Sequence, residues 1–291
     1  MKKSHSEYIA ERNIALANAE NGETVKLNEK KYEDALRIVD LEDKLKPNMP
    51  ILIEPKMNKP FKITNYLAIV LHQDMLVNED AYTSFIPKVI SSQARNFHFV
   101  IDKEGVIFKL NPVERAVMHC KYKKYSKRAS EYFGEIYCPI YEDTEKTPHD
   151  KFISPNLCTI SICVPKINDN GDMGNLAYTS LIKLCAYLIN CYAKYLQAQA
   201  NIICNYYIPE DKTLNKDPLC FYSEKDYSKL SYQEIADLIK KNDEENNSTP
   251  DAKYLRFRYE VERLRGEWYM KYRGKGIIRG YPDIIYQTIE E

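Results

Sequence analysis

The sequence predicts an α/β protein with a central mixed sheet flanked by helices and with helical extensions at both ends of the chain. Short apolar runs of the length of buried strands alternate with helical segments through the middle of the chain. Such alternation is typical of a sheet covered on both faces. Towards both ends, apolar residues recur at three- and four-residue steps, the spacing of amphipathic helices.

The strands of the middle region are predicted by apolar runs bounded by turn residues, at 66–71, 97–101, 106–110, 159–164 and 200–204. The second and third runs flank the turn Asp102-Lys103-Glu104-Gly105, so we expect them to form a hairpin. Between the last two runs, the apolar residues from Leu176 to Leu196 have helical spacing and predict one long helix.

Three regions follow from these patterns: a helical N-terminal arm (1–50), a sheet domain (60–230), and a helical, basic and aromatic C-terminal extension (231–291). In the arm, Tyr32, Leu36, Val39 and Leu41 recur at helical steps and predict a short amphipathic helix. Prolines between residues 47 and 60 prevent a helix from continuing and mark a boundary. A capping box, Ser231-Tyr232-Gln233-Glu234, opens the extension.

The composition favours a protein that is made and folded in a cytoplasm. The 42 basic and 42 acidic residues balance, so no global charge attracts nucleic acid or an anionic membrane. The first seven residues contain lysines, but no apolar signal-peptide core follows, and no segment is long and apolar enough to span a bilayer. The eight cysteines contain no C-x-x-C pair, and we expect reduced thiols, mostly small buried side chains.

The C-terminal extension contains a predicted helix with an apolar face formed by Phe257, Val261, Leu264 and Trp268, with arginines elsewhere. We expect this face to pack on its own domain or on a neighbouring subunit. A nucleic-acid-binding arm is the alternative, and the interleaved glutamates argue against it.

His72 ends the first predicted strand, within Ile69-Val70-Leu71-His72. The carboxyl ends of strands in an α/β sheet open onto the crevice where ligands bind, which makes this histidine a candidate ligand. Taken alone, such a histidine is more often a hydrogen-bonded bystander.

Further motifs follow His72 in a fixed order. They are Phe97-His98-Phe99-Val100-Ile101-Asp102-Lys103-Glu104-Gly105-Val106-Ile107-Phe108-Lys109-Leu110-Asn111-Pro112, Val117-Met118-His119, Asn156-Leu157-Cys158-Thr159-Ile160-Ser161-Ile162, and Ile202-Ile203-Cys204-Asn205 with Lys216-Asp217-Pro218. Over about residues 64 to 222 this series resembles the N-acetylmuramoyl-L-alanine amidase family of phage endolysins and peptidoglycan recognition proteins. The family's pattern is I-V-I-H, S-x-H-Y/F-x-I-D-x-D-G-x-I-Y-Q-L-x-P, W-H-A-G, N-x-x-S-I-G-I-E, and V-x-x-H with K-x-C/D-P.

The resemblance implies a cleft that holds one zinc ion on three protein ligands, with an open position for the water that attacks the scissile amide. Its ligand positions fall on His72, Asn205 and Asp217. The neutral amide of Asn205 binds zinc far less well than the imidazole that it replaces. Zinc is therefore possible, but we expect it to be absent or weakly bound.

The other catalytic positions of the family are also altered. The glutamate that takes the water's proton falls on Cys163, and the nearby lysine falls on Asn215, with Lys216 next to it. The resemblance places His98 and His119 at the cleft, although His98 also fits the packing of the hairpin. The metal site is therefore predicted to be degenerate.

Two other chemistries remain open. His119 can join His72 and Asp217 in a shifted metal site, or Cys163 can act as a nucleophile with His119 as its base. A buried cysteine on a core strand is ordinarily inert, which weighs against the nucleophile. Cys204 should face the core, because neighbouring strand residues point to opposite faces.

The long segment between His119 and Asn156 is rich in tyrosine and lysine. Long loops beside a cleft often serve as lids or partner contacts, and the plain alternative is a solvated excursion.

Three functions fit these observations. The first is a structural or peptidoglycan-binding component of a bacteriophage virion or tail, assembled into the particle through its terminal helical arms. The second is an active zinc amidase, a cell-wall hydrolase with an atypical ligand set. The third binds the sugar or peptide of the cell wall without cleaving it. All three rest on analogy of fold rather than on a demonstrated site.

Overall fold

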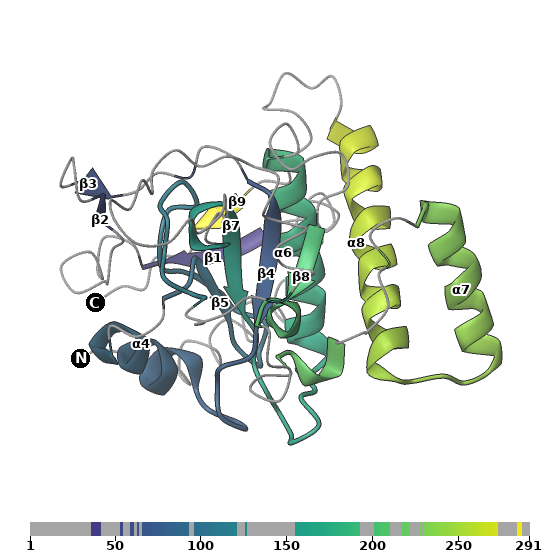
Figure 1. Ribbon diagram of the computed structural model, residues 1–291, viewed down its shortest axis with the longest axis horizontal. Helices are drawn as coiled ribbons and strands as arrows, with labels where there is room; N and C mark the ends of the chain where they lie inside the picture. Colours follow the sequence, from purple (N-terminus) through teal and green to yellow (C-terminus); the bar gives the residue numbers. More distant parts are fainter. Residues whose placement is uncertain are drawn as a thin grey trace, which may run out of the picture.

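The computed structural model describes somewhat more than half of the chain (Figure 1). The described residues are 36–41, 53–54, 59–60, 63, 66–92, 96–120, 126, 155–192, 201–209, 217–221, 227, 230–272 and 284–286.

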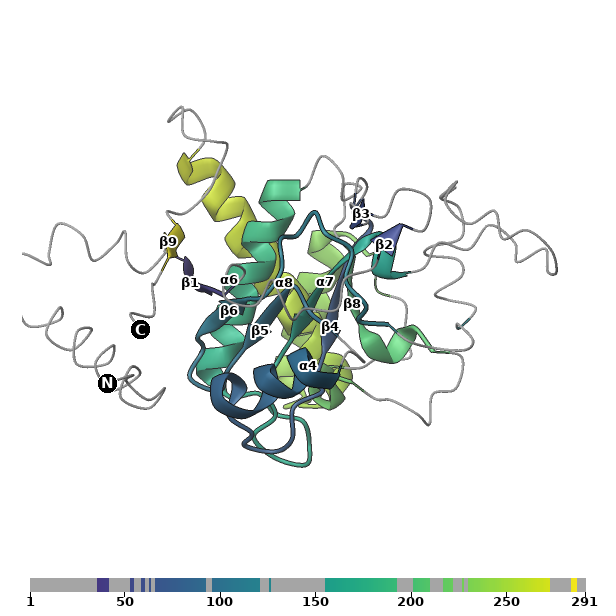
Figure 2. The same ribbon diagram turned by 90° about the vertical axis from the view of Figure 1, so that its left-hand side faces the viewer.

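A seven-stranded sheet forms the centre, in the order β8-β4-β7-β5-β6-β1-β9. Strands β8, β4, β7 and β5 are parallel, β6 is antiparallel to β5, and β1 and β9 are parallel to β6. Figure 2 shows β9 and β1 at one edge and β8 at the other. The predicted mixed sheet is confirmed. The strands are β1 Leu36–Asp40, β4 Ala68–His72, β5 Phe99–Ile101, β6 Ile107–Lys109, β7 Thr159–Cys163, β8 Asn201–Cys204 and β9 Ile284–Tyr286.

Strand β1 corrects the prediction of a helix around Leu36 and Val39. Leu36 and Ile38 face one apolar cluster, whereas Val39 and Leu41 face another, which is the alternation of a strand. Because β1 lies between β6 and β9, pairing with distant segments overrides the helical spacing. At least this part of residues 1–50 therefore belongs to the sheet, and residues 1–35 lie outside the described chain.

Helices cover both faces of the sheet. Figure 1 shows α4 on one side and, on the other, α6, α8 and α7 in succession. The predicted capping box is present at the start of α7, where the Ser231 hydroxyl accepts a bond from Glu234 N and the Glu234 carboxylate accepts one from Ser231 N. The helices are α4 Ile86–Ser92, α6 Asn175–Tyr192, α7 Tyr232–Glu244 and α8 Pro250–Tyr272.

Shorter elements complete the described chain. One turn of π-helix, η3 Ala81–Phe85, leads into α4, and a separate antiparallel pair joins β2 Ile53–Glu54 to β3 Lys59–Pro60. Three short 3-10 turns are η4 Pro155–Leu157, η5 Asn205–Tyr207 and η6 Leu219–Phe221. No helix in the described part of the chain is long and apolar enough to cross a membrane.

Helix α8 packs on the protein's own sheet domain, the first of the two arrangements expected for its apolar face. Phe257 is fully buried and stacks on Phe221 with ring centroids 5.0 Å apart. The Tyr254 hydroxyl donates to the carbonyl of Ile202 in β8 at 2.6 Å. The extension is thus continuous with the main core.

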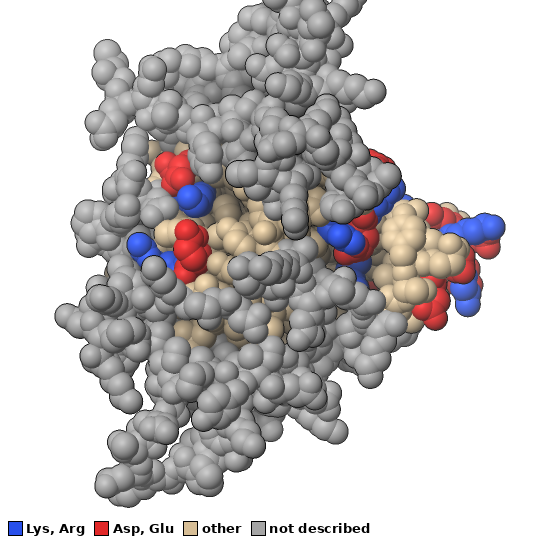
Figure 3. All heavy atoms as spheres, turned by 90° about the horizontal axis from the view of Figure 1, so that it is seen from above, with Lys and Arg blue, Asp and Glu red and all other residues tan. Residues whose placement is uncertain are grey.

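The arginines of α8 lie among acidic side chains. Arg265 pairs with Glu262, Arg263 pairs with Glu267, and Arg256 contacts Asp243 of α7. Figure 3 shows both charge signs interleaved at the end of the molecule that α7 and α8 form. Such mixed charge neutralises the basic character that the arginines suggest in the sequence.

We expect Phe257→Ala to destabilise the whole domain by about 3–5 kcal/mol, because it removes a fully buried aromatic ring from the core. Arg263→Ala on the solvent side of α8 should change stability by no more than about 0.5 kcal/mol. Urea unfolding followed by circular dichroism measures both values. A small effect of Phe257→Ala would mean that α8 is a detachable appendage.

Candidate metal centre

Parallel pairing places His72 where the carboxyl ends of three neighbouring strands, β8, β4 and β7, meet. His72 is the last residue of β4 and lies opposite Cys163, the last residue of β7. Asn205 directly follows β8, the other neighbour of β4. His72 and Asn205 are both completely buried.

His119 approaches His72 from a loop that Asn156 holds in place. The Asn156 side-chain oxygen accepts from the backbone N–H groups of His119, at 3.0 Å, and of Cys120, at 2.8 Å. Its amide nitrogen donates to the carbonyl of Cys120 at 2.9 Å. This clamp brings His119 Nδ1 to 2.9 Å from His72 Nε2.

The hydrogen bonds of Thr159 determine which nitrogen of His119 carries the proton. The Thr159 hydroxyl donates to the carbonyl of Pro155 at 2.6 Å, so it accepts from His119 Nε2, which lies 2.9 Å away. The proton of His119 is therefore assigned to Nε2. Its Nδ1 consequently presents a lone pair towards His72.

Cys120 completes a group of three candidate ligands. Its Sγ lies 3.2 Å from His119 Nδ1 and 3.9 Å from Asn205 Oδ1. The ligand atoms of His72, His119 and Cys120 all lie within 4.8 Å of one another, and all three side chains are buried. Cys120 was predicted from the sequence only as a small buried side chain. The adjacency of histidine and cysteine in His119-Cys120 was the available signal.

The donor set and its spacing suit a small divalent cation. Around a tetrahedral zinc ion with bonds of about 2.0–2.3 Å, two ligand atoms are separated by roughly 3.3–3.6 Å. The separations of 2.9 and 3.2 Å are slightly shorter, and the 3.9 Å from Cys120 Sγ to Asn205 Oδ1 is slightly longer. These three separations lie within a few tenths of an ångström of the tetrahedral values, the ligand atoms of His72, His119 and Cys120 all lie within 4.8 Å of one another, and imidazole with thiolate is a donor set typical of zinc.

Asp217 is the third ligand position that the resemblance implies. Within the described ranges, the group of candidate ligands contains Cys120 and not Asp217. The backbone carbonyl of Asp217 accepts from Tyr206 N at 2.9 Å, which ties it to the turn after β8. Asn215 and Lys216 lie outside the described residues.

Cys163, at the family's glutamate position, is fully buried among the apolar residues under α4. Burial raises the pKa of its thiol well above the ordinary value, and the carboxylate of Asp74 raises it further. Cys163 is therefore a protonated thiol near neutral pH. This state opposes a role as either a base or a nucleophile.

His98 joins the hairpin to β7. Ser161 N donates to His98 Nδ1 at 3.0 Å, so the proton lies on Nε2, which donates to the carbonyl of Arg115 at 2.8 Å. Burial lowers the pKa of His98 to about 4. His98 is thus a neutral residue that uses both ring nitrogens to hold the fold.

Cys204 points away from the candidate metal centre, as the strand alternation predicts. It is buried in the cluster beneath α6 and α8, and its Sγ donates to the carbonyl of Phe221 at 2.6 Å. The prediction that Cys204 faces the core is confirmed.

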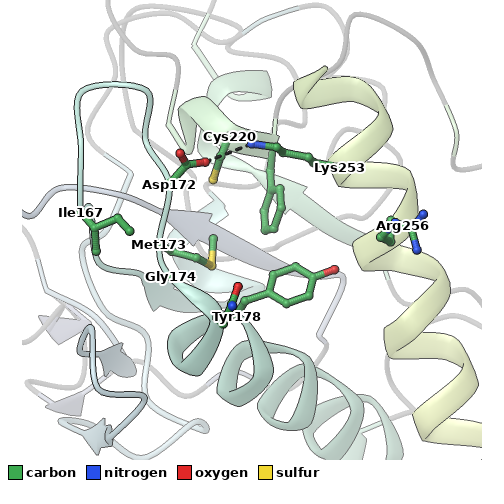
Figure 4. Close-up of a pocket in the computed structure, with 10 residues that line it drawn as sticks. Ile167, Asp172, Met173, Gly174, Tyr178, Cys220, Lys253 and Arg256 are labelled. Carbon is green, nitrogen blue, oxygen red and sulfur yellow. Dashed lines mark hydrogen bonds and ion pairs between the residues drawn. The ribbon is translucent and has the colours of Figure 1, made fainter. Parts of the chain in front are cut away.

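A separate pocket of about 400 Å³ lies between the loop after β7, the start of α6, and α8 (Figure 4). An ion pair of 3.0 Å between Lys253 and Asp172 crosses its upper side. The pocket is lined by Ile167, Asp172, Met173, Gly174, Asn175, Tyr178, Cys220, Phe221, Lys253 and Arg256. None of the three candidate ligands contributes to it.

Comparison with solved structures finds the same class of proteins that the motifs resemble. The endolysin N-acetylmuramoyl-L-alanine amidase LysCS from Clostridium intestinale is 16% identical, with 61% of this chain and 86% of that chain covered and a TM-score of 0.34. The Staphylococcus aureus hydrolase AmiA is 10% identical, with 80% of this chain and 86% of that chain covered and a TM-score of 0.40. The Ph2119 endolysin from a Thermus scotoductus bacteriophage is 14% identical, with 69% of this chain and 97% of that chain covered and a TM-score of 0.36. No family model and no curated protein matches the chain. Similarity this remote does not extend to the residues of a site.

The buried state of His98 predicts a pH dependence of stability. Its folded pKa of about 4 lies below the unfolded value near 6.5, so the folded state prefers the neutral ring. The stabilisation is complete above about pH 6.5 and is lost as the pH falls to 4, by roughly 3 kcal/mol.

Urea unfolding at pH 7 and pH 4 tests this with His98→Gln, which does not titrate in that range. The variant should be less stable at pH 7 and lose roughly 3 kcal/mol less than the wild type on acidification. Equal losses in both proteins would show that His98 is not held neutral.

Proposed function

We propose that this chain is a divergent amidase-fold protein that has lost hydrolytic chemistry and that serves as a peptidoglycan-binding or structural component of a bacteriophage virion or tail. The observation that carries the proposal is the chemical state of two buried side chains. Asn205 stands where the family places its second histidine ligand, and Cys163 stands where it places its glutamate.

The loss of hydrolysis is argued from what these groups are able to do. A general base must accept a proton from water near neutral pH. A buried thiol with a raised pKa is already protonated, and an amide is not a base in this range. The residues of β4 and β7 therefore preserve the sheet without preserving the water-activating group.

Wall binding without cleavage is supported by the pocket beside α8. Lys253 and Arg256 line it, paired with Asp172 and Asp243 respectively, so a ligand carboxylate would exchange with one of these aspartates, and Tyr178 brings an aromatic ring. These groups suit the carboxylates and sugars of peptidoglycan fragments, for which charge-assisted hydrogen bonds give the strongest contacts. The virion or tail context rests on analogy with phage endolysins.

The alternative is an active zinc amidase with an atypical ligand set. The contact of 2.9 Å between His72 and His119 favours it, because two imidazoles already converge at the strand ends. Activity would further require a ligand position open to water and a substitute for the glutamate.

Incubation of the full chain with purified peptidoglycan separates these functions. We expect co-sedimentation with the wall and no release of peptide in zinc-replete buffer, because the water-activating group is absent. Lys253→Ala should weaken wall binding by roughly tenfold, the cost of about one charge-assisted hydrogen bond. Lys240→Ala, an exposed change on α7 outside the pocket, is the matched control.

Two results would contradict the proposal. Peptide release that His72→Ala abolishes would establish the active amidase. Failure to sediment with peptidoglycan from several bacteria would exclude the wall-binding role.

A further inference from the structure

We propose that His72, His119, Cys120 and Asn205 form a closed structural site for a divalent cation of the zinc type. Compared with the ligand set implied by the family resemblance, the site keeps His72 and Asn205 and takes His119 and Cys120 in place of Asp217. The proposed site rests on the proposed function, the loss of hydrolysis, because both require that no coordination position is open to water.

Three donor atoms converge on one point. His119 Nδ1 presents its lone pair because Thr159 holds the proton of His119 on Nε2. His72 Nε2 lies 2.9 Å from that nitrogen, and Cys120 Sγ lies 3.2 Å from it. A cation between them would contact all three atoms, in place of the hydrogens that His72 Nε2 donates to His119 Nδ1 and that the Cys120 thiol donates to Asn205 Oδ1, 3.9 Å away, in the metal-free state.

The surroundings of His119 are those of a metal-bound histidine. Such histidines typically donate the second ring N–H to an oxygen that fixes the tautomer and the ring orientation. The Thr159 hydroxyl fills this role and is itself fixed by its bond to the Pro155 carbonyl. Asn156 fixes the backbone of both loop ligands, so the donor geometry exists before any ion binds.

Asn205 supplies the fourth donor and closes the site. Its Oδ1 lies 3.9 Å from Cys120 Sγ, close to the separation of two ligands on one tetrahedral ion. Cys120 is 2% exposed and the other three side chains are 0% exposed. Four protein ligands without solvent access are the mark of structural zinc sites, whereas catalytic sites keep a position for water.

Binding is balanced by the loss of one proton. The Cys120 thiol becomes a thiolate and releases its proton to solvent, the proton of His72 occupies Nδ1 while Nε2 binds the ion, and His119 keeps its tautomer. The centre then carries one net positive charge. The negative charges of Asp74 and Asp217 raise the pKa of Cys163, the register partner of His72. The same carboxylates would partly offset the positive charge of the centre.

The bound ion would connect parts of the chain that are far apart in sequence. His72 lies 47 residues from His119, and Cys120 lies 85 residues from Asn205. An ion held by these four residues ties β4, the loop before Cys120 and the end of β8 together. Since the unfolded chain lacks the site, zinc should raise the melting temperature in a concentration-dependent way.

Metal analysis of the full chain, prepared without a histidine tag, tests the site. We expect stoichiometric zinc after dialysis and a thiolate-to-metal charge-transfer absorption when cobalt replaces zinc. Cys120→Ala should abolish that absorption and weaken zinc binding by about 100-fold or more, because it removes the only thiolate ligand. Cys185→Ala, which removes a buried thiol of α6, should leave both unchanged.

Asn205→Asp provides a test in which the variant should bind zinc more tightly, and not more weakly, than the wild type. It replaces a neutral oxygen donor by a carboxylate of the same size, so we expect zinc to bind at least about tenfold more tightly. Substoichiometric zinc in the wild type, no thiolate absorption with cobalt, or unchanged affinity in Asn205→Asp would each overturn the four-ligand site.

Failure of this inference differs from failure of the proposed function. Absence of zinc with wall binding and no turnover would remove the metal site and leave the function intact. Stoichiometric zinc together with peptide release would show an open, catalytic centre and would overturn both.

Discussion

Parallel pairing of β4 with β7 and β8 is the constraint on which the rest of the structure depends. It places His72, Cys163 and Asn205 together at the carboxyl ends of these three strands, which form one edge of the sheet. Side chains at this edge are positioned by backbone hydrogen bonds rather than by loops, so their spacing survives changes in the residues themselves. A chain can therefore keep the framework of an active site after its chemistry has changed.

The chemistry at this edge is determined by burial. A thiol or an imidazole without access to water favours its neutral form, and this makes Cys163 an inert thiol and His98 a neutral support. The same burial gives His72, His119 and Cys120 a different property. Two imidazoles and a thiol that lie this close together are good ligands once an ion displaces a proton.

Much of the fold could be predicted from the sequence, because buried strands and amphipathic helices leave strong local patterns. The runs that became β4, β7 and β8 and the capping box of α7 are examples. Strand β1 could not be recognised, because its identity comes from pairing with β6 and β9, which lie far away in the chain. Local spacing around Leu36 and Val39 contains no information about those partners.

The candidate site was predicted only in part for the same reason. His72 could be placed from its strand end, and Asn205 and His119 through the resemblance. Cys120 has no signature beyond its adjacency to His119, and the clamp by Asn156 on its backbone leaves its Sγ 3.2 Å from His119 Nδ1. Asp217 was selected through the resemblance, whereas the described structure groups Cys120 with the two histidines instead.

The closed four-ligand site can be tested by anomalous diffraction at the zinc edge, with crystals of the full chain grown with zinc. We expect a single peak bounded by His72, His119, Cys120 and Asn205, with no water bound to the ion. A peak bounded by His72 and Asp217 with an exchangeable water would contradict it, because that arrangement is an open hydrolase centre.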